Sequence, residues 1–193
     1  MSLVLASKSA SRRAMLDAVG VAYRCEPADV DERAIEAALG DAPAAAIALA
    51  LAEAKALAVR DEDALVLGSD SLVSVDLRRF DKPASREEAA AHLRFFSGKA
   101  MELHSAAAIQ RAGSIAWSGG AVARLHVRDL SDSFIQAYLD AEWPEVGHCV
   151  GVFRIEARGV QLFERIVGDH FTVLGMPLLA VLGALRERGL VAA

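Results

Sequence analysis

A single acidic side chain interrupts a segment that otherwise reads as buried strand. Residues 65–75 are apolar at both ends and carry Gly-Ser-Asp-Ser in the middle, with Asp70 as their only carboxylate. Short runs rich in Val and Leu predict strands, so we expect Asp70 to lie at a break between two strands. A turn aspartate that binds its own backbone is the common alternative. Because an unpaired buried charge is costly, a functional Asp70 needs cationic partners.

The N-terminal segment predicts a phosphate site. Residues 3–6 read as a buried strand, residues 7–11 as a hydroxyl-rich loop, and residues 12–19 as a helix closed by a glycine. A helix N-terminus presents free N–H groups to anions but disfavours the positive charges of Arg12 and Arg13. A bound phosphate would account for both arginines, and solvated surface arginines are the alternative.

Two lysines extend the set of cations. Lys55 lies on an otherwise apolar stripe of an Ala-rich helix expected over residues 43–59. A lysine that extends its ammonium group to water is the alternative reading of that position. Lys82 ends a polar tip at residues 76–81.

These cations suit a polyphosphate if they converge on Asp70. Cations bind phosphoryl oxygens and stabilise the charge that develops as a bond breaks. A carboxylate can orient and deprotonate the attacking water. A divalent ion would bridge the phosphate oxygens, held by carboxylates and water.

Composition excludes several other classes of protein. The net charge of −5 and the pI near 5.5 argue against a broad nucleic-acid face and against a basic membrane surface. Cys25 and Cys149 have neither metal-binding nor CxxC spacing, which favours a reducing, cytoplasmic location. No apolar run approaches the roughly 18 residues of a membrane span. The apolar and basic residues at the N-terminus stand in the opposite order to a secretory signal.

The remaining periodicity alternates helices with strands, which predicts an α/β domain with a mixed sheet. A single domain is expected over residues 1–193. Ser85 and Ser131 are expected to cap helices, the first through a capping box with Glu88. The other expected helices cover residues 33–39 and 177–188, and the other expected strands cover residues 21–25, 101–110, 114–127 and 172–174.

Seven short motifs occur in a fixed order along the chain: SKSASRR at 7–13, DVDE at 29–32, AKA at 54–56, GSD at 68–70, KP at 82–83, SG at 97–98 and Gly175-Met176-Pro177. Each motif is weak alone, but the ordered set is specific. By these motifs the chain resembles the Maf family of nucleoside triphosphate pyrophosphatases from about residue 3 to residue 189. The resemblance implies an elongated, two-lobed Maf/ITPase-like fold, with a central mixed sheet flanked by helices and a cleft between the lobes.

The same resemblance implies roles for individual residues. The family cleaves a nucleoside triphosphate to the monophosphate and pyrophosphate with a divalent metal, here Mg²⁺, Mn²⁺ or Co²⁺. Asp70 would accept the proton, and Glu32 would face the base or the metal, so either carboxylate is a candidate metal ligand. Arg13 is added as a substrate-binding residue from the helix argument above. The remaining phosphate-site residues by this match are Ser7, Arg12, Lys55 and Lys82.

The finer motifs look like the branch of the family that acts on 7-methyl-GTP. HCVG at 148–151, LFER at 162–165 and Glu156 carry this likeness, with Ser11 and Ser71 at the other specificity positions. N7-methylated guanine is cationic and exposes N–H donors, so a carboxylate at Glu156 suits it, whereas a neutral glutamine suits thymine or uracil.

The chain departs from that branch in four places, which bear on substrate choice. Ser11 stands where the branch often has an aromatic residue, a loss of roughly 1–3 kcal/mol of base stacking. Ala10 replaces a proline, and Asp81 and Ala157 replace glycines. A dTTP or UTP pyrophosphatase, and a nucleotide-binding regulator of septum formation, are the alternative functions. We expect a nucleotide substrate, no nucleic-acid or membrane partner, and allow for a homodimer.

Overall fold

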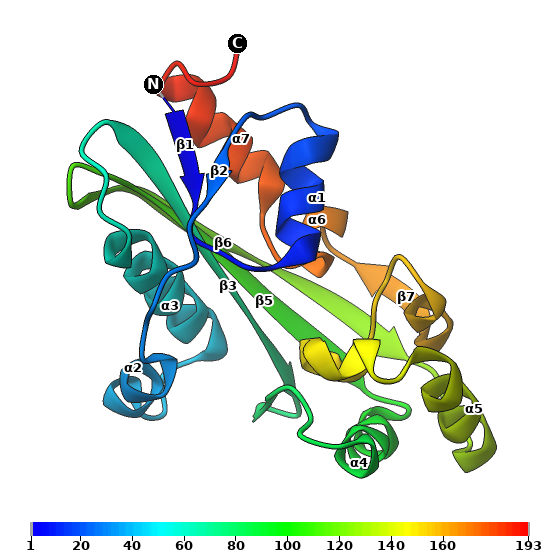
Figure 1. Ribbon diagram of the computed structural model, residues 1–193. Coiled ribbons are helices and arrows are strands. Elements are labelled where there is room, and N and C mark those ends of the chain that lie inside the picture. The colour runs from blue at the N-terminus through cyan, green and yellow to red at the C-terminus, as the bar shows by residue number, and fades with distance from the viewer. Residues whose placement is uncertain (1, 193) are drawn as a thin grey trace. The chain divides into compact units, whose positions relative to one another are not determined.

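The computed structural model describes residues 2–192, and its helices and strands alternate along the chain (Figure 1). The strands are β1 (Ser2–Leu5), β2 (Arg24–Cys25), β3 (Ala64–Val75), β4 (Arg78–Phe80), β5 (Ala100–Arg111), β6 (Ser114–Val127) and β7 (Phe163–Val167). They form one sheet in the order β2-β1-β3-β5-β6-β7, and β4 pairs with β3. The pairs β1–β2 and β1–β3 are parallel, whereas β3–β4 and β6–β7 are antiparallel. The predicted α/β class with a mixed sheet flanked by helices is therefore confirmed.

The chain divides into two compact units. The first comprises residues 1–71, 104–122 and 169–193, and the second comprises residues 72–103 and 123–168. No helix within residues 2–192 is long and apolar enough to cross a membrane. Helices of the first unit are α1 (Ala10–Ala18), α2 (Glu32–Leu39), α3 (Ala44–Ala58), α6 (His170–Val173) and α7 (Leu178–Glu187). The second unit contains α4 (Arg86–Phe96), α5 (Asp132–Glu142) and the 3-10 helices η1 (Glu145–His148), η2 (Val150–Val152) and η3 (Arg158–Leu162).

Side-chain caps explain where five of these helices begin. The side chains of Ser9, Asp31, Ser85, Ser131 and Asp169 each accept a hydrogen bond from a backbone N–H in the first turn. The caps predicted at Ser85 and Ser131 are confirmed.

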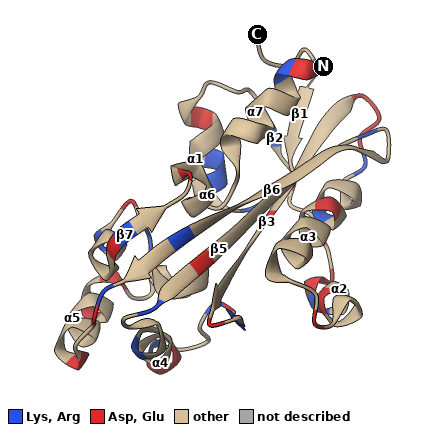
Figure 2. Ribbon diagram, turned by 180° about the vertical axis from the view of Figure 1, so that it is seen from behind, with Lys and Arg blue, Asp and Glu red and all other residues tan. Residues whose placement is uncertain are grey.

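One strand prediction was wrong in a way that matters for function. Asp70 does not lie at a break, because β3 runs without interruption from Ala64 to Val75. The polar residues in its middle stay in the strand because their side chains find partners there. Figure 2 shows how few charged residues the long strands carry, which makes a carboxylate within β3 exceptional.

Three local expectations also need correction. Residues 76–81 are not only a polar tip, since β4 folds back on β3 through a tight turn with positive φ at Asp76 and Leu77. The strand expected at residues 172–174 is wrong, because Thr172 and Val173 belong to α6 and Leu174 caps its C-terminus; the cap at Asp169 starts a helix despite the β-branched residues. The second strand is limited to Arg24 and Cys25.

The alternation of side chains along β1 and β3 assigns each residue to one face of the sheet. Leu3, Leu5, Leu65 and Leu67 are buried in a cluster with residues of α1 and α7. Val4 and Val66 point the other way, into a cluster that includes Val59 at the end of α3. Figures 1 and 2 agree that α3 covers the opposite face from α1 and α7. By the same alternation, Ser69 and Ser71 face α1 and Asp70 faces α3.

Gly68 allows α3 to approach β3 closely at the turn that carries Lys55. A Cβ at Gly68 would lie 2.2 Å from the carbonyl oxygen of Ala52 and 2.4 Å from the backbone nitrogen of Ala56. Both atoms belong to the helix backbone, so no side-chain movement could make room. The glycine of the Gly-Ser-Asp motif is therefore a packing requirement that sets the distance between Asp70 and the helix.

We predict that Gly68→Ala destabilises the fold by about 3 kcal/mol, near the upper end for overpacking, because α3 must move away from β3. The free energy of unfolding in urea measures this effect. Gly183→Ala on α7 is the matched control, since its Cβ would meet nothing within 4 Å and alanine favours helix. Equal stability of the two variants would contradict the packing argument.

Candidate active site

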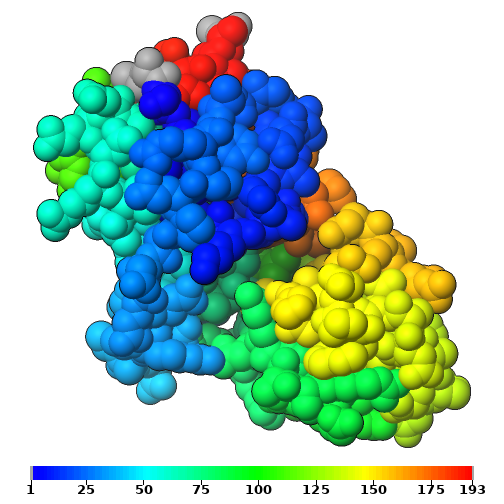
Figure 3. Space-filling view, viewed as in Figure 1, coloured from blue at the N-terminus to red at the C-terminus, as the bar shows by residue number. Residues whose placement is uncertain are grey.

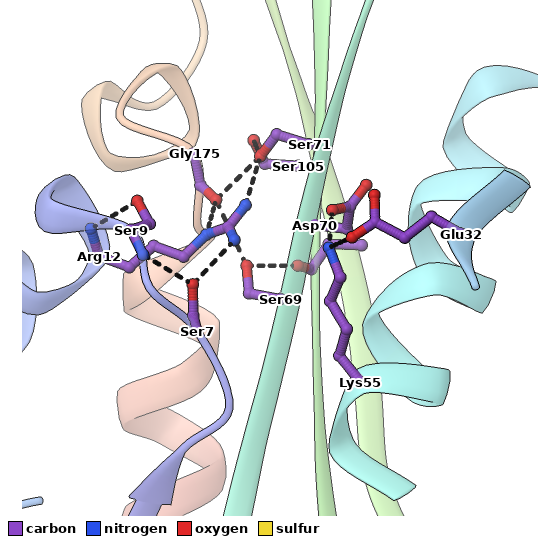
Figure 4. Close-up of polar contacts among 11 residues, drawn as sticks. Ser7, Ser9, Arg12, Glu32, Lys55, Ser69, Asp70, Ser71, Ser105 and Gly175 are labelled. Carbon is purple, nitrogen blue, oxygen red and sulfur yellow. Dashed lines mark hydrogen bonds and ion pairs between the residues drawn. The ribbon is translucent and has the colours of Figure 1, made fainter. Parts of the chain in front are cut away.

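Asp70 forms an ion pair with Lys55 on the α3 face of β3. Lys55 Nζ lies 2.5 Å from Asp70 Oδ1 and 2.7 Å from Glu32 Oε1 (Figure 4). Asp70 is 7% exposed, so its charge is largely withdrawn from water and depends on this ammonium group. The structure thus brings together three residues that the sequence analysis had singled out from separate segments.

The helices that hold this cluster explain its geometry. Lys55 follows the buried residues Ala48 and Leu51 on one stripe of α3, as predicted. It lies in the last turn, where the helix dipole favours a cation. Glu32 is the first residue of α2, which packs against α3, and the dipole favours an anion there. The alternative of a lysine that only extends to solvent is excluded, since its ammonium meets two carboxylates.

Arg12 lies on the other face of β3, and its hydrogen-bond partners within residues 2–192 are neutral oxygens. Its Nε donates to the carbonyl of Gly175 at 3.0 Å, and its two terminal nitrogens donate to Ser7 Oγ at 3.4 Å and Ser71 Oγ at 3.3 Å. Burial lowers the pKa of Arg12, against the opposing effect of Asp70 and Glu32. Arginine nevertheless remains protonated at physiological pH. A partly buried guanidinium with neutral partners is a ready site for an anion.

A group of hydroxyls fixes the orientation of Arg12. Ser71 Oγ donates to the Gly175 carbonyl at 2.9 Å and lies 2.9 Å from Ser105 Oγ. Ser105 Oγ in turn donates to the carbonyl of Thr172 at 2.8 Å, and Ser69 Oγ donates to that of Ala106 at 2.8 Å. Figure 4 shows these groups gathered on the side of β3 opposite Lys55.

Sequence reasoning gave no role to Ser69, Ser105 or the carbonyl of Gly175. A backbone carbonyl that accepts a hydrogen bond cannot be predicted from residue type. The glycine at position 175, however, indicates an unusual backbone conformation. Its φ of +100° is a conformation that other residues rarely adopt. A side chain there would also approach Ser71 Oγ to 3.3 Å.

The other predicted residues of α1 lie differently. Ser11 Oγ donates to the carbonyl of Leu174 at 2.8 Å, which ties α1 to the turn before Gly175. Arg13 is exposed, and its guanidinium is not among the groups that contact Ser7, Ser71 or Gly175. In Figure 3 the segment around α1, in dark blue, and the segment of α2, in lighter blue, both reach the surface of the first unit.

Lys82 and Glu156 both belong to the second unit and are exposed. Both act electrostatically on one thiol, that of Cys149. Burial raises the pKa of this thiol and Glu156 raises it further, whereas Arg154 and Lys82 lower it.

The donor set around Lys55 fits a divalent cation that is shared with a phosphate. Within residues 2–192, no group of three or more His, Cys, Asp or Glu is arranged to hold a metal ion by itself. Magnesium, however, is commonly bound by one or two carboxylates, with substrate phosphates and water completing the shell. Asp70 and Glu32, which converge on one ammonium group, supply such a pair.

The chain belongs to the Maf family, because the family model described as Maf-like protein matches residues 2–188. Named relatives cover nearly the same length. The chain is 45% identical to a 7-methyl-GTP pyrophosphatase from Rhizobium meliloti, over 97% of this chain and 96% of the relative. It is 43% identical to a nucleoside triphosphate pyrophosphatase from Nitrobacter hamburgensis, over 97% and 94% respectively. A 7-methyl-GTP pyrophosphatase from Rhizobium etli is 41% identical over 97% and 96%. The predicted family is confirmed.

We predict that Arg12→Lys weakens binding of inorganic tripolyphosphate by about 10- to 100-fold. Lysine keeps the positive charge, but it lacks the planar guanidinium whose nitrogens donate in several directions at once. The variant therefore loses at least one charged hydrogen bond to the ligand, which contributes about 1.5–3 kcal/mol. Calorimetric titration of the ligand into the variant and the wild type measures the change. Arg186→Ala, an exposed position on α7, serves as the control. An unchanged dissociation constant for Arg12→Lys would show that the phosphates bind elsewhere.

Proposed function

We propose that the protein hydrolyses 7-methyl-GTP to 7-methyl-GMP and pyrophosphate. The coarser activity, hydrolysis of a nucleoside triphosphate with release of pyrophosphate, follows from the family and from the names of its relatives. The observation that carries the proposal is the contact of Lys55 with both Asp70 and Glu32, in the same unit as the guanidinium of Arg12. The names of two relatives, at 45% and 41% identity, support the choice of base.

In this proposal the two cations of the first unit bind the phosphates. The guanidinium of Arg12 donates to the neutral oxygens of Ser7, Ser71 and Gly175, and phosphate oxygens are stronger acceptors. Lys55 exchanges part of its contact with the carboxylates for a phosphoryl oxygen. Both groups then stabilise the negative charge that moves to the leaving pyrophosphate. Lys82 of the second unit is a third phosphate ligand by its match to the family.

Asp70 acts as the general base. The water oxygen bonds to the α-phosphorus, the bond from that phosphorus to the bridging oxygen breaks, and pyrophosphate leaves with that oxygen. Asp70 accepts the proton of the attacking water. Lys55 Nζ, 2.5 Å from Asp70 Oδ1, fixes the orientation of this carboxylate.

Asp70 and Glu32 are the proposed ligands of a divalent cation. When bound, Mg²⁺, Mn²⁺ or Co²⁺ supplies positive charge to the phosphate oxygens. Glu32 is half-exposed, with a side-chain exposure of 48%, so its carboxylate can turn toward an arriving ion without leaving α2. Lys55 holds the two carboxylates close together before the ion arrives.

Glu156 is the proposed reader of the base. An exposed carboxylate can accept hydrogen bonds from the N1–H and amino group of guanine, and it also offsets the positive charge of the methylated ring. Ser11 and Ser71 are proposed to contribute to specificity from the first unit. Ser11 is small, and without an aromatic residue at that position the methylated ring depends more on Glu156.

We predict that Asp70→Asn lowers kcat for 7-methyl-GTP by about 10²–10⁴, the range for loss of a general base. The amide keeps the shape of the side chain but accepts no proton. Pyrophosphate release measures turnover, and calorimetric titration checks that the substrate still binds. Asp41→Asn, an exposed position after α2, is the control. Turnover by Asp70→Asn at the wild-type rate would remove Asp70 from the mechanism.

A panel of 7-methyl-GTP, GTP, dTTP and UTP with Mg²⁺ tests the substrate. We expect the highest kcat/KM for 7-methyl-GTP, and a loss of roughly tenfold or more for it in Glu156→Gln, since a charged hydrogen bond contributes about 1.5–3 kcal/mol. Glu164→Gln, exposed on β7, should leave the order of substrates unchanged. A wild-type preference for dTTP or UTP would contradict the proposal.

A further inference from the structure

Glu156 lies in a turn that is closed by a backbone hydrogen bond. The backbone N–H of Ala157 donates to the carbonyl of Arg154 at 3.1 Å, which makes Glu156 the third residue of a hydrogen-bonded turn. Gly159 packs against the same residue, since a Cβ there would lie 2.5 Å from the Arg154 oxygen and 2.7 Å from its nitrogen. These backbone contacts define the turn that carries Glu156.

Arg154 is a cation two residues before Glu156 in the same hydrogen-bonded turn. The pKa of Arg154 is raised chiefly by its hydrogen bond to Glu142, and Glu145 and Glu156 add to this effect. If its guanidinium were free, it would be drawn to the exposed carboxylate two residues away. Such a pair would neutralise the group proposed to bind a cationic base.

Glu142 prevents this by holding the guanidinium itself. Its Oε2 accepts from a terminal nitrogen of Arg154 at 3.0 Å, and its side chain is only 6% exposed, against 33% for Arg154. It lies in the last turn of α5, one turn after Tyr138, whose hydroxyl donates to the carbonyl of Val152 at 3.0 Å. The helix is thus fixed against the segment that precedes Arg154.

We propose that Glu142 is a specificity-positioning residue: by binding Arg154 it keeps that cation away from Glu156 and leaves the Glu156 carboxylate free for a positively charged base. This inference rests on the proposed function, and it identifies Glu142 as a residue that controls the selectivity for 7-methyl-GTP over GTP. Glu142 touches neither the base nor the phosphates. Its effect is confined to the discrimination between 7-methyl-GTP and GTP, which differ in the charge of the ring.

The test is the ratio of kcat/KM for 7-methyl-GTP to that for GTP. In Glu142→Gln we expect this ratio to fall about tenfold, because the released guanidinium pairs with Glu156. In Arg154→Gln and in the double variant Glu142→Gln/Arg154→Gln we expect it to stay within about threefold of wild type, since the competing cation is gone. Asp140→Asn is the matched control, because it removes the same charge from the same helix and breaks an ion pair with Arg86.

Each outcome decides the point. A wild-type ratio near one would refute the proposed function itself, whatever the variants do. If the wild type prefers 7-methyl-GTP but Glu142→Gln loses activity on both substrates equally, Glu142 is structural and the inference is wrong. A low ratio that persists in the double variant, or an equal fall in Asp140→Asn, would also overturn it. Should Glu142→Gln fail to fold, a tenfold loss of the ratio in Arg154→Gln would overturn the inference, and its retention would support it.

Discussion

The site depends on an ion pair placed inside a β-strand. Asp70 is nearly buried in the middle of β3, where a carboxylate without a partner would be strongly destabilising. Lys55 removes that cost, but it also contacts Glu32, so three charged groups carry a net charge of −1. Arg12, on the opposite face of β3, also interacts electrostatically with both carboxylates. The Lys55–Asp70 pair therefore holds the carboxylate inside the strand and places it beside Glu32.

The strand also explains how one short motif serves two tasks. Successive side chains of β3 point to opposite faces, so Asp70 meets Lys55 while Ser69 and Ser71 lie on the face of Arg12 (Figure 4). Gly68 completes the arrangement, because only a residue without a side chain lets α3 approach the strand at this point. Within the first unit, Asp70 and the hydroxyl of Ser71 that contacts Arg12 are thus held on a strand rather than on a loop.

Much of this arrangement was predictable because it rests on residue type and period. Lys55 stood out as a charge on an apolar stripe, and Arg12 as a cation near a helix N-terminus that disfavours it. The continuity of β3 was not predictable, since polar residues in the middle of a strand normally indicate a turn, and their partners lie far away in the sequence. The role of the Gly175 carbonyl was not predictable for a different reason. Every residue carries a backbone carbonyl, so the sequence does not indicate which one accepts a functional hydrogen bond. The order of motifs, by contrast, already indicated the family.

The most direct test of the account is a crystal structure of the Asp70→Asn variant with 7-methyl-GTP and Mg²⁺. The account predicts phosphate oxygens within hydrogen-bond distance of the Arg12 guanidinium and of Lys55 Nζ, with the amide of residue 70 facing the α-phosphorus. A triphosphate bound away from these groups, with Arg12 still held only by Ser7, Ser71 and Gly175, would contradict it.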